Sequence, residues 1–272
     1  MISPELQKEL RDKYNPDGSK LRELQEQLLR MLVDFDRICK DNGIRYWLDG
    51  GTCLGAVRHN GFIPWDDDID VGMLEEDYQK LLTCFKENDD YAIQHQENDL
   101  YYLHGYAKFR DKHSTVYETG KGDDLNFKYR GLFIDVFSFG YNNLPTFIYQ
   151  YSKQFSIWLT SLARIENPSA LAVSIYKILK SIHIKFIAML RKHDNINRNG
   201  TIRCSAGICF YKHVYNYSCI EETVDMDFEG HKLPIPKGYD AYLKCLYGDY
   251  MTLPDEKRIA SDAHFFNYTI DR

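Results

Sequence analysis

The chain has 272 residues, of which 44% are hydrophobic and 27% are charged, a composition typical of a globular protein with a full core. Its net charge of -6 argues against a general nucleic-acid binder, because such proteins normally carry a basic surface. Aromatic residues make up 14% of the chain and include 21 Tyr, which favours apolar surfaces with polar rims.

The seven cysteines are odd in number and include no CxxC pair, which favours free buried thiols in a reducing compartment. We therefore expect a cytoplasmic protein. The N-terminal residues contain no apolar stretch of the kind found in secretory signals, and no apolar run reaches the ~18 residues that span a bilayer. A zinc cluster is the alternative interpretation for Cys204, Cys209, Cys219 and His213, although the spacing of these residues fits no standard zinc finger.

The first half of the chain alternates between helical and strand-like patterns. Apolar residues at helical spacing predict an amphipathic helix over 21–39, which Gly43 ends. The elements expected next are a strand over 45–48, a helix over 52–58 that starts just after two glycines, a loop over 59–65, a helix over 75–85, and strands over 101–109 and 132–137.

The composition changes over 145–192, which is apolar, aromatic and basic and is broken once at Asn167-Pro168. It contains seven Lys and Arg against one Glu and predicts two helices. We expect an α+β core over 1–144, a basic helical hairpin over 145–195, and a C-terminal part over 196–272 that packs back on the core with a helix over 239–246.

The mixture of apolar, aromatic and basic residues in the hairpin suits helices that lie on an anionic membrane. This pattern predicts peripheral membrane contact through 145–192. The alternative is that both helices pack their apolar faces on the core and leave their Lys and Arg in solvent.

An acidic run over 66–71 carries the strongest chemical signal. In a strand, Asp68 and Asp70 would point the same way while Ile69 and Val71 enter the core. Two adjacent carboxylates repel each other unless a cation lies between them, and oxygen-only sites suit Mg²⁺ or Mn²⁺. The alternative is a solvated acidic turn.

A later carboxylate, Asp135, interrupts an otherwise apolar strand. A buried carboxylate needs a partner, and a metal shared with the acidic run is one candidate. A salt bridge to Lys108 or Arg130 is the other.

Upstream of the acidic run, Gly50, Gly51 and Thr52 begin a short helix whose free N–H groups would hold a phosphate close to the backbone. The order Gly-Gly-Thr, then Asp-x-Asp, then a later strand Asp is typical of the nucleotidyltransferase fold. In that fold, metal ions bridge phosphate oxygens during an in-line displacement.

The chain also resembles a known family over two adjoining segments, 46–59 and 61–71. They carry the signature G-x-x-L-G-x-x-R followed by G-F-I-P-W-D-x-D-x-D, which resembles the LicD/fukutin family. The similarity continues at 107–109, 131–137, 242–243 and 247–251, and leaves 145–192 unmatched.

The resemblance implies a phosphodiester-forming transferase. Bacterial members of the family transfer phosphocholine from CDP-choline to lipooligosaccharide, teichoic acid or capsule, and animal relatives transfer ribitol phosphate from CDP-ribitol. By that similarity Asp68, Asp70 and Asp135 would be catalytic and hold Mg²⁺, with Asp66 joining or orienting the site. The expected acceptor is a glycan hydroxyl, including lipid-linked glycans. Transfer of another polyol phosphate, or nucleotide binding without catalysis, are the alternatives.

Other residues are candidates for substrate contacts. Arg58 and Lys108 would neutralise phosphate charge, although each would equally serve in a structural ion pair. Trp65, beside the acidic run, is the best single candidate for an aromatic face against choline, with packing of the loop as the alternative. His59 fits a structural role better than a catalytic one.

Overall fold

The computed structural model describes residues 2–117, 126–163, 169–207, 213–262 and 267–270. The helices are α1 (Pro4–Tyr14), α2 (Lys20–Asp41), α3 (Gly50–His59), α4 (Glu75–Cys84), α5 (Thr146–Ala163), α6 (Ala170–Asp194), α7 (Tyr239–Tyr247) and α8 (Glu256–Asp262), with a 3-10 turn, η2 (Tyr217–Cys219). The strands are β1 (Trp47–Leu48), β2 (Asp70–Leu74), β3 (Tyr91–Gln94), β4 (Ala107–Asp111), β5 (Ser114–Tyr117), β6 (Phe133–Tyr141), β7 (Thr201–Cys204), β8 (Tyr215–Asn216), β9 (Thr223–Phe228), β10 (His231–Pro236) and β11 (Asn267–Ile270).

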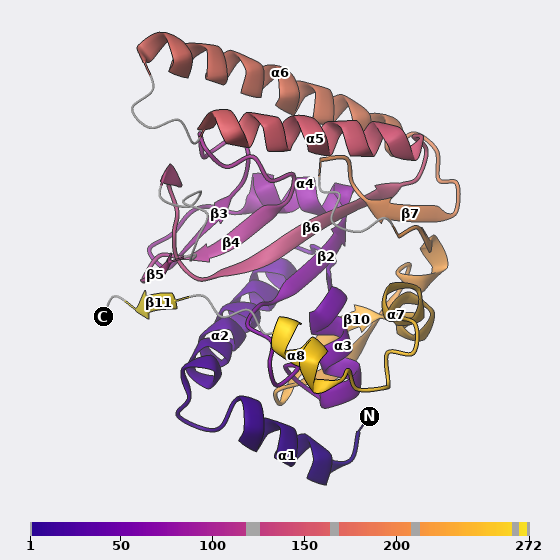
Figure 1. Ribbon diagram of the computed structural model, residues 1–272. Coiled ribbons are helices and arrows are strands. Elements are labelled where there is room, and N and C mark those ends of the chain that lie inside the picture. The colour runs from indigo at the N-terminus through magenta and orange to yellow at the C-terminus, as the bar shows by residue number, and fades with distance from the viewer. Residues whose placement is uncertain (1, 118–125, 164–168, 208–212, 263–266, 271–272) are drawn as a thin grey trace.

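A mixed sheet forms the centre of the molecule, with strands in the order β1–β2–β6–β4–β3 (Figure 1). Strands β2 and β6 run parallel, whereas β1, β4 and β3 pair antiparallel to their neighbours. The long strand β6 pairs with β4 through its first half and with β7 through its last residues, so β7 and β8 extend the same sheet. Helices and a mixed sheet together confirm the α+β class.

Helix α2 packs its apolar face against the sheet. Ser19 caps its first turn by accepting a hydrogen bond from the Arg22 N–H, and Gly43 follows its end with a φ of 58°. Phe35, fully buried on this helix, meets Phe109 of β4 edge to face, with ring centroids 5.3 Å apart. The helix predicted over 21–39 is therefore confirmed.

Several predicted boundaries were wrong. Helix α3 begins at Gly50 rather than after the two glycines, because Asp49 already occupies the N-cap position. The strand expected over 101–109 begins only at Ala107, since the preceding residues turn back on themselves, with the Tyr102 hydroxyl donating to the Tyr106 carbonyl at 3.0 Å. Strand β1 is limited to Trp47–Leu48.

The expected hairpin is present as α5 and α6, which lie side by side along one side of the molecule, away from α1 (Figure 1). The break expected at Asn167-Pro168 lies outside the described residues. Among the helices that the structure describes, none is long and apolar enough to cross a membrane.

The cysteines in the described residues are free thiols. Cys39, Cys53 and Cys204 are buried, as expected, whereas Cys84 and Cys245 are exposed. One member of the possible zinc group, the cysteine at position 209, lies outside the described residues.

Candidate active site

The acidic run forms a compact carboxylate cluster just before β2. One side-chain oxygen each from Asp66, Asp67 and Asp68 lies within 4.8 Å of the other two. The cluster is tied to α2, because the fully buried Gln25 donates from Nε2 to the Asp66 carbonyl at 2.8 Å. The predicted alternation is observed in burial, since Ile69 and Val71 are fully buried and Asp68 and Asp70 are partly exposed, although β2 starts only at Asp70. Asp67, which was not predicted, joins the cluster.

Asp70 and Asp135 lie directly opposite each other on the parallel strands β2 and β6, and Lys108 of β4 lies opposite Asp135 on its other side. Because paired residues on adjacent strands project from the same face, the three side chains form one row. Lys108 Nζ donates to Asp135 Oδ1 at 2.6 Å, with side chains only 6% and 15% exposed. The ion pair foreseen for Asp135 is thus observed.

The first turn of α3 lies against these carboxylates. A methyl group added at Gly51 would lie 3.1 Å from Asp66 Oδ2, and one added at Gly50 would lie 3.4 Å from Asp70 Oδ2. The Thr52 hydroxyl accepts a hydrogen bond from the Asp70 N–H at 2.9 Å. The glycines therefore let two carboxylates approach the helix start, where the helix dipole favours negative charge.

The carboxylates raise one another's pKa. Burial raises the pKa of Asp66 well above its ordinary value, and the negative charges of Asp68 and Asp67 raise it further. Burial likewise raises the pKa of Asp70, followed by the charges of Asp68 and Asp135. Such a group of partly buried acids is electrostatically unfavourable alone, and an added cation would relieve it.

The sequence reasoning missed Asp49, which is buried at the N-terminus of α3. Its Oδ1 accepts hydrogen bonds from Trp47 Nε1 at 3.1 Å and from the Tyr242 hydroxyl. Burial raises its pKa to about 6. The Tyr242 contact joins residues 193 positions apart, so no local pattern reveals it.

Arg58 lies at the far end of α3 from the glycines and is 3% exposed. Its Nη1 donates to the Tyr250 carbonyl at 2.8 Å, and its Nε donates to His59 Nε2 at 2.9 Å. The ring of His59 also meets Gln7 Oε1 at 2.6 Å, and burial lowers the pKa of His59 to about 3. These contacts favour the structural alternative for both residues.

Trp65 is also buried, with 6% of its surface exposed. Its ring meets Tyr14 of α1 edge to face at 5.3 Å and lies 6.1 Å from the His59 ring. This packing favours the structural alternative over an aromatic face for choline.

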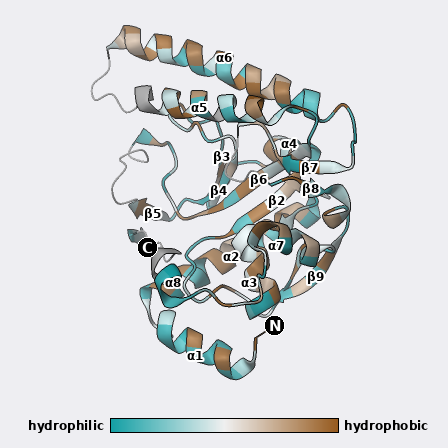
Figure 2. Ribbon diagram, turned by 45° about the vertical axis from the view of Figure 1, so that its right-hand side comes forward, coloured by the Kyte–Doolittle hydropathy of each residue, from teal (hydrophilic) through white to brown (hydrophobic). Residues whose placement is uncertain are grey.

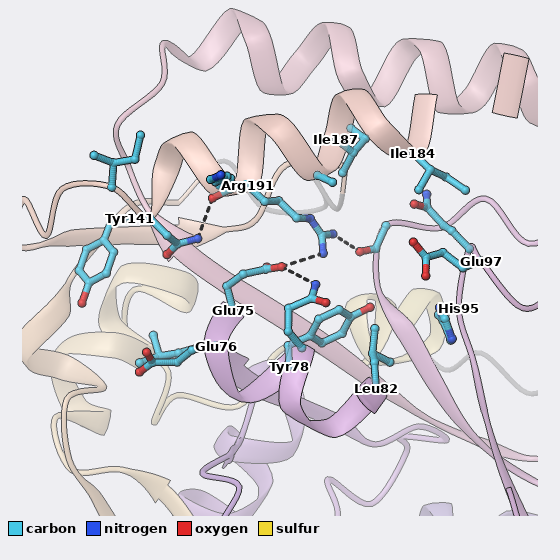
Figure 3. Close-up of a pocket in the computed structure, with 18 of the residues that line it drawn as sticks. Glu75, Glu76, Tyr78, Leu82, His95, Glu97, Tyr141, Ile184, Ile187 and Arg191 are labelled. Carbon is cyan, nitrogen blue, oxygen red and sulfur yellow. Dashed lines mark hydrogen bonds and ion pairs between the residues drawn. The ribbon is translucent and has the colours of Figure 1, made fainter. Parts of the chain in front are cut away.

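A cavity of about 600 Å³ opens elsewhere, between α4 and the C-terminal half of α6 (Figure 3). Arg191 points into it from α6 and meets Glu75 at 3.5 Å. The cavity adjoins the end of β2 at Leu74, whereas the carboxylates lie at its start. It is therefore separate from the carboxylate site.

The chain is 30% identical over 259 residues to the lipopolysaccharide cholinephosphotransferase LicD of Haemophilus influenzae, covering 87% of this chain and 93% of that protein. The chain belongs to the LicD family. Residues 43–168 match the family described as LicD/FKTN/FKRP, nucleotidyltransferase domain. That match contains the glycines, the acidic run and Asp135, and it extends into α5, which the sequence resemblance had wrongly left unmatched.

Shorter matches are found to animal transferases. The human ribitol 5-phosphate transferase FKRP is 60% identical over 35 residues, which cover 13% of this chain and 7% of that protein. The mouse ribitol-5-phosphate transferase FKTN is 31% identical over 112 residues, which cover 41% of this chain and 22% of that protein.

Proposed function

We propose that this chain is a metal-dependent transferase that moves phosphocholine from CDP-choline to a hydroxyl of a cell-surface glycan. The observation that carries the proposal is the gathering of Asp66, Asp68, Asp70 and Asp135 at the first turn of α3. The likeness to a lipopolysaccharide cholinephosphotransferase over most of both chains supports the choice of cargo and acceptor. The order of these elements also supports the nucleotidyltransferase fold.

The donor set fits Mg²⁺ or Mn²⁺, because it consists of carboxylate oxygens whose mutual repulsion raises their pKa values. Asp66, Asp68, Asp70 and Asp135 are the residues that would hold the ion. The chemistry that such an ion supplies when bound is neutralisation of charge on the phosphate oxygens of the donor.

The chain's own residues would complete the reaction. The N–H groups at Gly50 and Gly51 would bind donor phosphate oxygens close to the backbone. Lys108 holds the Asp135 carboxylate in place, so that Asp135 would accept the proton of the attacking glycan hydroxyl. The hydroxyl oxygen forms a bond to the phosphorus that carries choline, the phosphoanhydride bond breaks, and CMP leaves.

Transfer of ribitol phosphate is the second candidate, favoured by the 60% identity to FKRP within a short segment. The two reactions differ in the cargo and share the CDP portion of the donor. Binding of the donor therefore distinguishes these two reactions, whereas turnover is needed to distinguish either from a module that binds a nucleotide without catalysis.

The experiment is calorimetric titration of the chain with CDP-choline in Mg²⁺ and in EDTA, with Asp68→Asn as the variant. We expect binding that requires Mg²⁺, that the variant loses, and that CDP-ribitol and CDP-glycerol do not compete away. Binding of CDP-ribitol in preference would select the second candidate. Absence of binding by any cytidine nucleotide would overturn the donor class. Release of CMP in the presence of a glycan acceptor separates a transferase from a binding module.

We also propose that the reaction takes place on the cytoplasmic side of the membrane. Free thiols at six described cysteines support a reducing compartment. Lipid-linked glycans would then be accessible as acceptors at the membrane surface.

A further inference from the structure

Helix α6 turns an apolar stripe away from the protein. Large apolar side chains recur every three or four residues along it and are 43–71% exposed: Leu171, Ile175, Ile178, Ile182, Phe186 and Met189. This spacing places them on one side of the helix. A contiguous exposed apolar surface of this kind marks an interaction site, whereas single exposed residues do not.

Helix α5 extends the same surface. Phe147, Tyr151 and Trp158 are 55%, 73% and 47% exposed. They are separated by four and seven residues, which places them on one side of the helix. Figure 2 shows hydrophobic stretches along both helices at the outer edge of the molecule. Together these side chains form what we call the outer hairpin face: the exposed apolar residues of α5 and α6 named above.

The inner side of α6 buries charged residues beside apolar ones: Tyr176, Ile187 and Leu190 pack in small apolar clusters, and Lys180 and Arg191 lie among them. Lys180 Nζ donates to the carbonyls of Asp99, Leu100 and Tyr102 at 2.5, 2.7 and 3.0 Å. Further along the same side, Arg191 reaches Glu75 below the helix (Figure 3). Since buried cations are rare and exposed apolar stripes are costly, this helix is built to place its outer apolar stripe against something outside the protein.

The charge around the outer hairpin face identifies that partner. Lys177, Lys185 and Lys192 of α6 are exposed, and the sequence contains no Asp or Glu over 146–163 or 169–193. A second copy of the chain would bring like charges together, whereas an anionic lipid surface would attract them. Helices with an apolar stripe flanked by lysines lie flat in the interface of such membranes.

We propose that the outer hairpin face docks this protein on an anionic lipid bilayer, with the apolar side chains inserted among the lipids and the lysines at the headgroups. The proposal stands on this surface alone. A failure of the transfer reaction would leave it intact, and its own failure would leave the reaction intact.

The test is co-sedimentation of the full chain with vesicles of phosphatidylcholine alone or mixed with phosphatidylglycerol. We expect binding to the mixed vesicles that weakens as salt is raised, and little binding to the neutral ones. Ile178→Ser with Ile182→Ser should weaken it by about tenfold or more, because both side chains leave the lipid. The control is Val224→Ser with Ile270→Ser, both about 40% exposed on other elements, and it should bind as the wild type does.

Charge is tested separately. Lys177→Glu with Lys185→Glu should weaken binding by at least about thirtyfold, since each lysine near an anionic surface contributes about fivefold. Lys86→Glu with Lys257→Glu, at exposed positions outside the hairpin, should bind nearly as the wild type does. Equal binding to neutral and anionic vesicles, or no binding to either, would overturn the proposal. Sedimentation velocity that finds a dimer, dissociated by the isoleucine variant, would assign the face to a second copy instead.

Discussion

Replacing Lys108 by Met tests whether this lysine holds Asp135 in place. The two side chains are 6% and 15% exposed and their charged atoms lie 2.6 Å apart, so the variant leaves a nearly buried carboxylate without its cation. Breaking such a pair by removing one partner costs about 3–5 kcal/mol. We expect the lower end, about 3 kcal/mol, because Asp135 retains some contact with water.

The assay is urea unfolding at neutral pH without divalent cations. The double variant Lys108→Met with Asp135→Asn should recover most of the lost free energy of unfolding, because the carboxylate charge is removed along with the lysine. The matched control is Lys232→Met. Lys232 lies 2.9 Å from Asp227, but its side chain is 64% exposed, so this variant should change the free energy of unfolding by less than about 1 kcal/mol.

Two outcomes would refute this reasoning. If Lys108→Met costs no more than Lys232→Met, the pair with Asp135 does not hold the site together. If Lys108→Met retains full stability but loses CDP-choline binding, Lys108 contacts the phosphate directly and its role as a positioning residue is wrong.

Gly51→Ala places a methyl group 3.1 Å from Asp66 Oδ2 and should weaken Mg²⁺ binding in calorimetry by about tenfold, with little change in melting temperature. Arg58→Met loses the bond to the Tyr250 carbonyl and should lower the free energy of unfolding by about 2 kcal/mol while leaving the affinity for CDP-choline unchanged. Burial lowers the pKa of Lys180 from 10.5 to about 8, so the unfolded chain binds more protons between these values. The stability of the wild type relative to Lys180→Met should therefore rise by about 3 kcal/mol from pH 8 to 10.5 in urea unfolding, and a flat difference would contradict it.

Local patterns in the sequence predicted much of the site. The acidic run, the glycines at the start of α3 and the lone Asp135 each stand out against their neighbours, and the structure brings them together. Periodicity also predicted α2, α4 and the hairpin, because each has a continuous apolar stripe.

Local patterns could not predict the features of the site that depend on contacts between residues far apart in the sequence. The hydrogen bond from Tyr242 to Asp49 and the bond from Arg58 to Tyr250 each join residues more than 190 positions apart. The contribution of Asp67 to the cluster depends on the path of the loop before β2, which strand alternation does not give.

Periodicity likewise cannot tell which side of a helix faces the core. In α6 apolar residues lie on both sides: Ile187 and Leu190 face inward together with Lys180 and Arg191, whereas a second apolar stripe faces out. The carbonyl groups that receive Lys180 help to set this orientation, and they belong to the loop after β3, far from α6 in the sequence.

The central claim is that the carboxylates form a divalent metal site. The most direct test is titration with Mn²⁺ followed by electron paramagnetic resonance, for the wild type, Asp70→Asn and the exposed control Asp89→Asn. We predict that the wild type and Asp89→Asn bind Mn²⁺ with the same affinity, that Mg²⁺ competes, and that Asp70→Asn loses the site. Equal Mn²⁺ binding by all three proteins, or no binding by the wild type, would contradict the account.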